Sequence, residues 1–233
     1  MNFDFCIISM ISVVIPCHNE EKGIQEVIPK LPKDAEIIVV DNNCTDNTAK
    51  VAQNLGARVV KEIVPGYGSA IRQGLKNVTG EVVAVLDGDN QYPGEKIPEA
   101  IEFLLKNNLD FVSCSRFPLR DKNAISPIRK IGNWGLTLAA NVLFGLGLKD
   151  SQSGMWVFKK RLLDKIVLEN NSMPFSEEIK IKAATYPGVR FNEFHIPYQE
   201  RTGASSLFPL KHGWQNLKYL LKLRWQLWFS RAK

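Results

Sequence analysis

The residues best suited to chemistry are two carboxylates that stand two positions apart, directly after an apolar run. Asp87 and Asp89 flank a glycine, and an Asn-Gln pair follows them. Aspartates with this spacing at a strand end can share one hard cation, because Mg2+ and Mn2+ prefer oxygen ligands and commonly bridge carboxylates to substrate phosphates. A turn that binds nothing has the same composition, since Asp, Gly and Asn favour turns. The spacing alone leaves both interpretations open.

A second polar set follows two other apolar runs. Glu20 ends the segment 16–20 (PCHNE), and Asp41 follows the run 36–40. If these runs are neighbouring strands, both carboxylates lie at one sheet edge and can accept hydrogen bonds from a base and a ribose. Glu20 has a second interpretation as an acid in the first turn of a helix, where negative charge stabilises the helix dipole.

A glycine-bearing loop, 65–69 (PGYGS), precedes a helical pattern. Glycine there allows either a close approach of the backbone to a ligand or a positive φ in a turn. An ordinary loop explains it equally well. It is not a dinucleotide fingerprint, because the G-x-G-x-x-G spacing after the first strand is absent.

The order of elements decides where these side chains lie. Apolar runs predict strands and helical spacing predicts helices between them, in strict alternation through residue 115. The predicted strands cover 11–15, 36–40, 57–60, 82–86 and 110–114, and the predicted helices cover 20–31, 46–55, 69–77 and 95–107. Such alternation predicts an α/β fold with a mostly parallel, Rossmann-like sheet covered by helices on both faces. Ligands of such sheets bind beyond the carboxyl ends of the strands, where Asp41, Asp87 and Asp89 fall.

The pattern changes after residue 115. Residues 127–146 are apolar and dotted with glycines, 154–159 and 189–197 suit strands, and 175–185 suit a helix. We expect one domain over 1–208, in which residues 1–9 form a possible extension before Met10. A long basic and aromatic helix is expected within the C-terminal segment 209–233.

Composition limits the classes of function. A hydrophobic content of 45% and a net charge of +6 fit a globular protein that is either simply basic or has an anionic partner, such as a phosphate, a nucleic acid or an acidic membrane. No nucleic-acid motif occurs, so we expect no nucleic-acid partner. The four cysteines lack metal-ligand spacing, which indicates a reduced, cytosolic compartment. The start of the sequence lacks signal-peptide features, and no apolar run reaches the roughly 18 residues of a spanning helix.

Six motifs, in this order along the chain, resemble those of family 2 glycosyltransferases, and most closely those of the dolichyl-phosphate mannose and glucose synthases. The resemblance implies a GT-A fold, a nucleoside diphosphate sugar such as GDP-mannose or UDP-glucose as donor, Mg2+ or Mn2+ as cofactor, and a polyprenyl (dolichyl) phosphate as acceptor. The motifs are 16–20 (PCHNE), 39–42 (VVDN), 87–93 (DGDNQYP), 115–116 (SR), 150–154 (DSQSG) and 201–205 (RTGAS).

The resemblance also implies roles for individual residues. Nucleotide-sugar binding would fall to Pro16, Asn19, Glu20, Asp41, Asn43, Gly68, Asp87 and Gly88. The metal would be held by Asp87, Asp89 and Gln91. Phosphate or acceptor contacts would come from Arg116, Arg129, Arg201 and Ser205, and catalytic roles would fall to Asp89, Asp150 and Arg201. Arginine suits phosphate because its planar fork binds two oxygens and stays charged.

The nature of the acceptor decides what Asp150 does. A phosphate monoester is largely a dianion near neutral pH, because its second pKa is about 6, so it attacks without a base. Asp150 would then position the sugar or the metal shell, whereas a sugar hydroxyl as acceptor would make Asp150 the first candidate for general base. A single displacement inverts the anomeric centre. The other functions considered are extension of a glycan or polysaccharide hydroxyl and a non-catalytic, nucleotide-binding partner subunit.

The segment 209–229 combines tryptophans and leucines at helical spacing with lysines and arginines. Aromatic rings and basic groups suit the interface between headgroups and acyl chains, so we expect peripheral docking on the cytoplasmic face of a membrane. The same apolar face could instead pack on the core or against a second subunit. The sequence leaves the donor sugar and the oligomeric state open.

Overall fold

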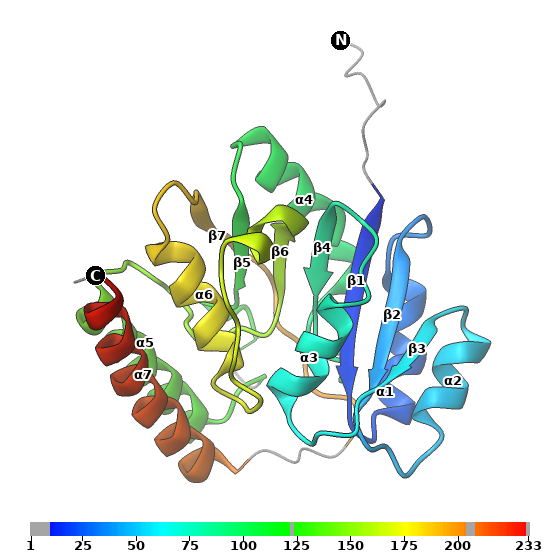
Figure 1. The fold of residues 1–233 in the computed structure, drawn as a ribbon. Coiled ribbons are helices and arrows are strands. Elements are labelled where there is room, and N and C mark those ends of the chain that lie inside the picture. Colours follow the sequence, from blue (N-terminus) through cyan, green and yellow to red (C-terminus); the bar gives the residue numbers. More distant parts are fainter. Residues whose placement is uncertain (1–9, 122–123, 204–207, 232–233) are drawn as a thin grey trace.

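The computed structural model describes residues 10–121, 124–203 and 208–231 and shows a seven-stranded sheet with helices on both faces (Figure 1). The strands are β1 (Ile11–Cys17), β2 (Glu36–Asp41), β3 (Arg58–Lys61), β4 (Val82–Val85), β5 (Phe111–Ser115), β6 (Trp156–Lys159) and β7 (Phe191–His195). The helices are α1 (Glu21–Val27), α2 (Thr48–Asn54), α3 (Tyr67–Leu75), α4 (Ile97–Lys106), α5 (Pro127–Phe144), α6 (Phe175–Thr185) and α7 (Pro209–Arg231). Short 3-10 turns are η1 (Ile28–Lys30), η2 (Gly94–Lys96) and η3 (Lys160–Asp164).

The strand order is β3-β2-β1-β4-β6-β5-β7, and every neighbouring pair is parallel except the two that involve β6. The prediction of a mostly parallel sheet is therefore confirmed. Cys17 at the end of β1 pairs with Asp41 at the end of β2, so these strands finish level with each other. The carboxyl ends of β1, β2 and β4 thus share one edge of the sheet, which is where the candidate carboxylates were expected.

The two faces of the sheet bury alternate residues of each strand. On β1, Val13 and Ile15 face a core that includes α1, α2 and α4, whereas Val14 faces a core that includes α3 and α6. All three side chains are fully buried. This explains why the strands show continuous apolar runs, because a sheet covered on both faces needs apolar residues at every position.

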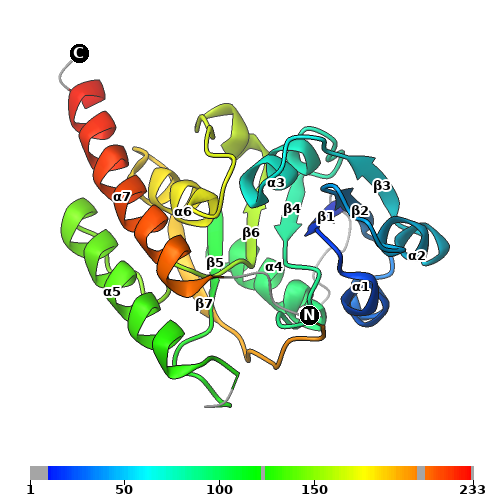
Figure 2. The ribbon, with the colours of Figure 1, turned by 90° about the horizontal axis from the view of Figure 1, so that it is seen from below.

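Helices α5 and α7 form an additional layer beyond α6, where they lie side by side (Figures 1 and 2). A small apolar cluster joins the three helices through Ala140 of α5, Ile181 of α6, and Leu220 and Leu223 of α7. The segment 127–146 was expected only to be apolar, and most of it is an 18-residue helix that ends at Gly145 with a left-handed φ of 66°. Its internal glycines concealed the helix, because glycine disfavours helix interiors.

Most predicted elements occur within a few residues of their expected bounds. The helix expected over 20–31 is shorter, because α1 ends at Val27 and Pro29 lies in the 3-10 turn that follows. The long C-terminal helix is present as α7. Among the described residues, no helix combines the length and hydropathy needed to cross a bilayer. The possible extension over residues 1–9 lies outside the described residues.

Candidate active site

The candidate site lies where β1, β2 and β4 end. Glu20 follows β1, Asp41 closes β2, and Asp87 and Asp89 follow β4. The strands are parallel and adjacent in the order β2-β1-β4, so their following loops converge at one edge. The sequence-predicted carboxylates of all three loops are brought to the same side of the sheet. Asp41 uses one carboxylate oxygen to accept a hydrogen bond from the Cys44 amide at 2.9 Å.

Arg201 joins two of these loops. Its Nη1 donates to the carboxylate of Asp89 and its Nη2 donates to that of Glu20. The segment that carries Arg201 runs back from β7 over the loop that follows β4. Two backbone hydrogen bonds hold this segment there, from Thr202 N to Asp89 O at 2.9 Å and from Gln199 N to Gln91 O at 3.0 Å. Arg201 is therefore positioned against Glu20 and Asp89 although 112 residues separate it from Asp89.

The electrostatics of this cluster show an excess of negative charge. Burial and the neighbouring charge of Asp89 raise the pKa of Asp87 to about 7. Burial also raises the pKa of Glu20 to about 7, against the opposing effect of Arg201. Asp89 has a raised pKa for the same reason of burial, again opposed by Arg201. Several buried carboxylates close together repel one another when they ionise. A divalent cation bound between them would offset that repulsion and stabilise the ionised forms.

The donor set fits a hard cation that is shared with a substrate. Among residues 10–121, 124–203 and 208–231, no three His, Cys, Asp or Glu side chains converge as a complete metal site. Asp87 and Asp89 would thus be two ligands, with phosphate or water oxygens supplying the rest, as is usual for Mg2+ bound with a nucleotide. Gln91 lies beside them, buried, and its Nε2 donates to Gln199 O at 3.3 Å.

The carboxylate of Asp87 is held in place from two sides. The Tyr67 hydroxyl, at the start of α3, donates to its Oδ1 at 2.9 Å. On the other side, a Cβ at Gly154 would lie 2.6 Å from its Oδ2, so only glycine fits there. Gly88 is equally constrained, since a Cβ at that position would lie 2.8 Å from Cys17 Sγ. These contacts give a packing reason for both glycines and place the loop 150–154 directly against Asp87.

The other residues assigned to the nucleotide sugar lie around this edge. Asn19 and Asn43 both adopt left-handed backbone conformations, with φ of 58° and 60°, which asparagine tolerates better than most residues. Asn19 also accepts a hydrogen bond from Thr45 N at 2.7 Å, which links the loops after β1 and β2. Pro16 is buried within β1. At Gly68, a Cβ would lie 2.2 Å from Asn170 O, so this glycine lets α3 pack against another segment of the chain.

Asp150 and Arg116 form a buried ion pair. The Arg116 Nε and Nη2 atoms donate to the two Asp150 oxygens at 2.7 and 2.8 Å, and the Arg116 amide donates to Oδ2 at 3.1 Å. Asp150 is fully buried, and its charged partner holds the pKa of this carboxyl below its usual value despite the burial. Asp150 is thus ionised but enclosed, and both of its oxygens are engaged. This geometry suits a residue that orients Arg116.

A cavity of about 550 Å3 lies next to this pair. The sheet side of its lining contributes the polar residues Gln91 and Arg116, with Tyr198 beside them, and Arg129 joins from the start of α5. The remainder is largely apolar and comes from α5 and α7, from the segment before α5 and from Met173 before α6. These residues include Ala124, Ile125, Ile128, Leu136, Met173, Leu210, Trp214 and Leu217. The structure thus brings Arg116 and Arg129 to one cavity and Arg201 to the strand-end cluster.

Several lining residues were not expected from the sequence. Tyr198 in the cavity and Tyr67 beside Asp87 show only as single aromatic residues in the chain, and their roles depend on tertiary contacts. Gln152 and Asn216 also line the cavity. Gln152 stands inside the motif 150–154, which is a signal that sequence analysis could have used, whereas Asn216 on α7 gives none. Ser205 lies outside the described residues.

Comparison with solved structures defines the class of the fold. A glucosyl-3-phosphoglycerate synthase from Mycobacterium tuberculosis, solved in complex with Mn2+, UDP and glucosyl-3-phosphoglycerate, matches with a TM-score of 0.73 at 22% sequence identity. The match covers 93% of this chain and 80% of that one. The seven-stranded sheet with its flanking helices is therefore a GT-A-like fold.

Sequence comparison then gives the family. Residues 12–167 match the profile of Glycosyl transferase family 2, and the chain belongs to this family. A dolichyl-phosphate hexose transferase from Haloferax volcanii is 30% identical over 207 residues, which are 87% of this chain and 89% of that protein. The low-salt glycan biosynthesis hexosyltransferase Agl6 from the same organism is 29% identical over 95% of this chain. This chain spans only 55% of the length of Agl6. The protein is accordingly a glycosyltransferase.

Proposed function

We propose that this enzyme transfers a hexose from a nucleoside diphosphate sugar, such as GDP-mannose or UDP-glucose, to a polyprenyl phosphate, with inversion at the anomeric carbon. The observation that carries the proposal is the cavity beside Arg116, because one part of its lining is polar and the rest is largely apolar. Arginines and a glutamine suit a phosphate, and the apolar side chains of α5 and α7 suit a hydrocarbon chain. The dolichyl-phosphate hexose transferase relative supports the same acceptor.

The strand-end cluster is the proposed donor site. Glu20 and Asp41 would accept hydrogen bonds from the base and ribose, and Asp87 and Asp89 would hold Mg2+ or Mn2+ against the diphosphate. The metal, when bound, would neutralise the charge that develops on the leaving diphosphate. Arg201, which contacts Glu20 and Asp89, would exchange those carboxylates for phosphate oxygens. The neighbouring structure that contains Mn2+ and UDP supports this assignment.

The proposed reaction needs no general base. A phosphate monoester with a second pKa of about 6 is mostly a dianion at pH 7, so its oxygen is already a nucleophile. The difficulty is instead the approach of one anion to another, and positive side chains offset that repulsion. Arg116, oriented by Asp150, and Arg129 lie where the acceptor phosphate would arrive. The enclosure of Asp150 supports the positioning role for this residue and favours a phosphate over a hydroxyl acceptor.

A test of the acceptor is a transfer assay with the purified chain, a radiolabelled nucleotide sugar and Mn2+. Four acceptors are compared: a short-chain polyprenyl phosphate, the matching polyprenol, a glycan and 3-phosphoglycerate. We expect label only in the polyprenyl phosphate, in a product of inverted anomeric configuration. Transfer to the glycan or to the small phosphate alone would contradict the proposed acceptor. Absence of transfer with every donor would favour a non-catalytic, nucleotide-binding subunit.

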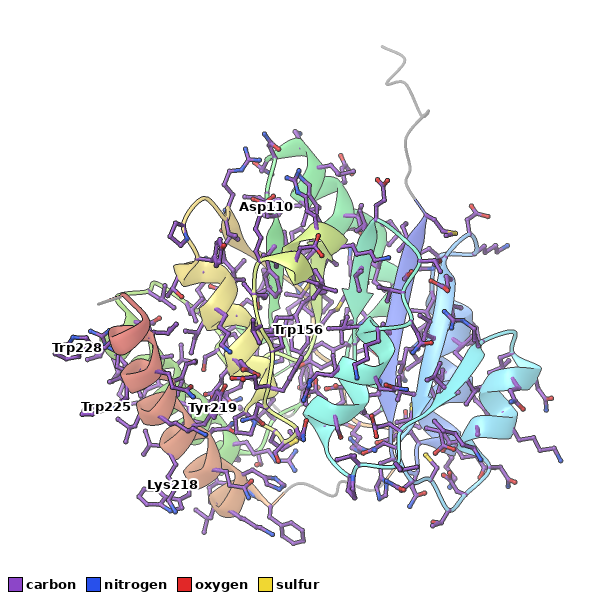
Figure 3. All side chains as sticks on the ribbon, viewed as in Figure 1. Asp110, Trp156, Lys218, Tyr219, Trp225 and Trp228 are labelled. Atoms are coloured by element: carbon purple, nitrogen blue, oxygen red, sulfur yellow. The ribbon has the colours of Figure 1, made fainter. Side chains whose placement is uncertain are left out.

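We further propose that the chain docks peripherally on the cytoplasmic face of a membrane, where such an acceptor would present its phosphate. On α7, the side chains of Trp214, Leu221, Trp225 and Trp228 are exposed, and Figure 3 shows Trp225 and Trp228 pointing away from the body of the protein. On α5, the exposed apolar residues are Ile128, Ile131, Trp134, Leu138 and Val142. These nine residues, together with Leu210, are called the α5–α7 apolar face below.

The charges around this face support an anionic lipid surface. Neither helix contains an acidic residue, and both carry lysine or arginine. Lys218 lies 5.2 Å from the Trp214 ring and Arg224 lies 5.5 Å from the Trp228 ring, so cations accompany the aromatic residues as they do at membrane interfaces. The free cysteines Cys17, Cys44 and Cys114 support the reducing, cytoplasmic side.

A further inference from the structure

A short chain of hydrogen bonds links α7 to the loop 150–154. Asn216 Nδ2 donates to Gln152 Oε1 at 2.7 Å, and Gln152 Nε2 donates to Glu177 Oε1 and, at 2.8 Å, to Ser151 Oγ. Asn216 is only 6% exposed and Glu177 is fully buried. Gln152 and Asn216 both line the cavity of about 550 Å3.

Two oxygens in this chain have no hydrogen-bond partner among the described residues, namely Asn216 Oδ1 and Glu177 Oε2. Buried polar atoms are nearly always paired, because an unpaired one loses its hydration without compensation. Asn216 Oδ1 is an acceptor, so the group that completes it must be a donor, whereas Glu177 Oε2 accepts when the carboxyl is ionised and donates when it is protonated. Both side chains are hydrogen-bonded to Gln152, but only Asn216 lines the cavity, so the unfilled capacity of the cavity wall is that of Asn216.

We infer that Gln152 and Asn216 form a subsite that recognises a hydroxyl group of the transferred hexose. The inference rests on the proposed donor, because it needs a sugar at the strand-end site. Location supports it: Gly154 touches Asp87, and Gln152 precedes Gly154 by two residues in the same loop. Gln91, beside the proposed metal ligands, lines the same cavity. A hexose attached to a diphosphate at Asp87 and Asp89 would therefore lie next to this loop.

The chemistry of the subsite excludes both parts of the proposed acceptor. A polyprenyl tail has no hydrogen-bond donor, and a phosphate dianion requires donors, whereas the unfilled Asn216 Oδ1 is an acceptor. A sugar hydroxyl is neutral, donates one hydrogen bond and accepts others, and so complements a carboxamide. Glu177 agrees with a neutral ligand, since burial raises the pKa of its carboxyl to about 8 and keeps it mostly uncharged at pH 7.

The function of this subsite would be to select the sugar. Hexoses differ in the presence and direction of single hydroxyl groups, and a site built to pair a buried hydroxyl discriminates strongly against a ligand that lacks it. Through Asn216, α7 would thus contribute to the choice of the donor sugar. The same helix also lines the proposed acceptor cavity. Arg116 and Asp150 are paired with each other, and Gln152 bonds to Asp150 through its backbone amide while its side chain bonds to Asn216.

The test measures donor binding without any acceptor, so it does not depend on which acceptor the enzyme uses. Dissociation constants for the preferred nucleotide sugar and for its monodeoxy analogues are determined by calorimetry with Mn2+. We expect one deoxy analogue to bind at least about tenfold more weakly to the wild type than the parent sugar does. Asn216→Leu should weaken the parent sugar and abolish that one difference, while the ratios for the other analogues stay unchanged.

Matched variants make the result decisive. Gln215→Leu changes the exposed neighbour on the same helix and should keep the wild-type ratios. Asn216→Asp keeps an acceptor oxygen and should retain the preference, and Gln152→Leu tests the subsite from the loop if the Asn216→Leu protein does not fold. Wild-type ratios in folded Asn216→Leu and Gln152→Leu would overturn the inference and assign the unpaired oxygens to buried water. Failure to bind any nucleotide sugar would contradict the proposed donor as well. Normal binding of the parent sugar, with every deoxy analogue binding equally well, would contradict the subsite alone.

Discussion

The strand-end cluster and the cavity beside α5 and α7 are built in different ways. In the cluster, charged groups gather at the ends of adjacent parallel strands, and Asp87 and Asp89 stand two residues apart in the sequence. In the cavity, Arg116, Arg129 and Asn216 come from three separate segments. The cluster holds carboxylates whose pKa values are raised by burial, whereas the cavity joins arginines to apolar side chains.

The two regions therefore depend on different features of the fold. Topology alone places side chains at the carboxyl ends of parallel strands, so a donor site of this kind is a property of the fold. The cavity depends on where the two outer helices pack, which the order of the strands does not determine. We therefore expect substitutions in the cluster to affect every reaction of the enzyme, and substitutions in the outer layer to affect the choice of sugar, acceptor or surface.

The largest effect is expected at Asp89. Asp89→Ala, or the isosteric Asp89→Asn, removes one proposed metal ligand and the partner of Arg201, and leaves the charge of the donor diphosphate unbalanced. Turnover should fall by at least about a hundredfold, as expected when charge stabilisation by a metal is lost. The measurement is steady-state transfer with saturating Mn2+, with the exposed Asp34→Asn as control. Turnover near that of the wild type would place the metal, if one is used, elsewhere.

A smaller loss is expected from Arg201→Lys. Lysine keeps the charge but cannot reach two partners with one planar group, as Arg201 does with Asp89 and Glu20. We expect kcat to fall by about tenfold, with a smaller change in KM, if the contact strengthens in the transition state. Arg190→Lys, at the opposite edge of the sheet, serves as the matched control. Identical kinetic constants in Arg201→Lys and the wild type would remove Arg201 from the phosphate site.

The outer helices offer the complementary test. Trp225→Ser combined with Trp228→Ser should weaken binding to anionic vesicles by about tenfold or more, because each exposed tryptophan would otherwise be buried at the interface. Donor binding should not change. Vesicle sedimentation at low salt measures the first quantity and calorimetry the second.

The control for this experiment is the pair Val167→Ser and Leu105→Ser, two exposed apolar residues outside the α5–α7 apolar face. Point substitutions are preferable to removal of α7, since the buried Leu220 and Leu223 pack with Ile181 and their loss would expose α6. Equal sedimentation of both double variants and the wild type would show that this face does not contact lipid.

The smallest effect concerns Glu177 and its pH dependence. Its pKa is about 8 in the folded protein, against 4.5 as the ordinary value. As pH rises through this window, the unfolded chain loses the proton and the folded protein keeps it, so folding stability falls; above about pH 8 both states are ionised and the fall ends. Glu177→Gln removes this titration. The Tm of the variant relative to the wild type should therefore increase from pH 5 to pH 8, with Glu26→Gln as control, and a constant difference would contradict it.

The sequence was most informative where local patterns and structure coincide. Alternating apolar runs predicted the parallel sheet, and the carboxylates at positions 41, 87 and 89 were expected at its carboxyl edge. The helix α5 was missed because glycines interrupt its pattern, and the antiparallel β6 gave no sign of its direction. The pairing of Asp150 with Arg116 and of Gln152 with Asn216 depends on tertiary packing, which residue types and spacing do not encode.

In the proposed enzyme, the strand ends hold the donor while the cavity between the sheet and the outer helices holds the lipid phosphate. Photo-crosslinking with a short polyprenyl phosphate that carries a diazirine in its tail tests this most directly. We expect labelled peptides from 127–144 and 209–231. Unlabelled polyprenyl phosphate should suppress this labelling, and Asp89→Asn should retain it. Labelling confined to other segments, or labelling of these helices that the competitor does not reduce, would contradict it.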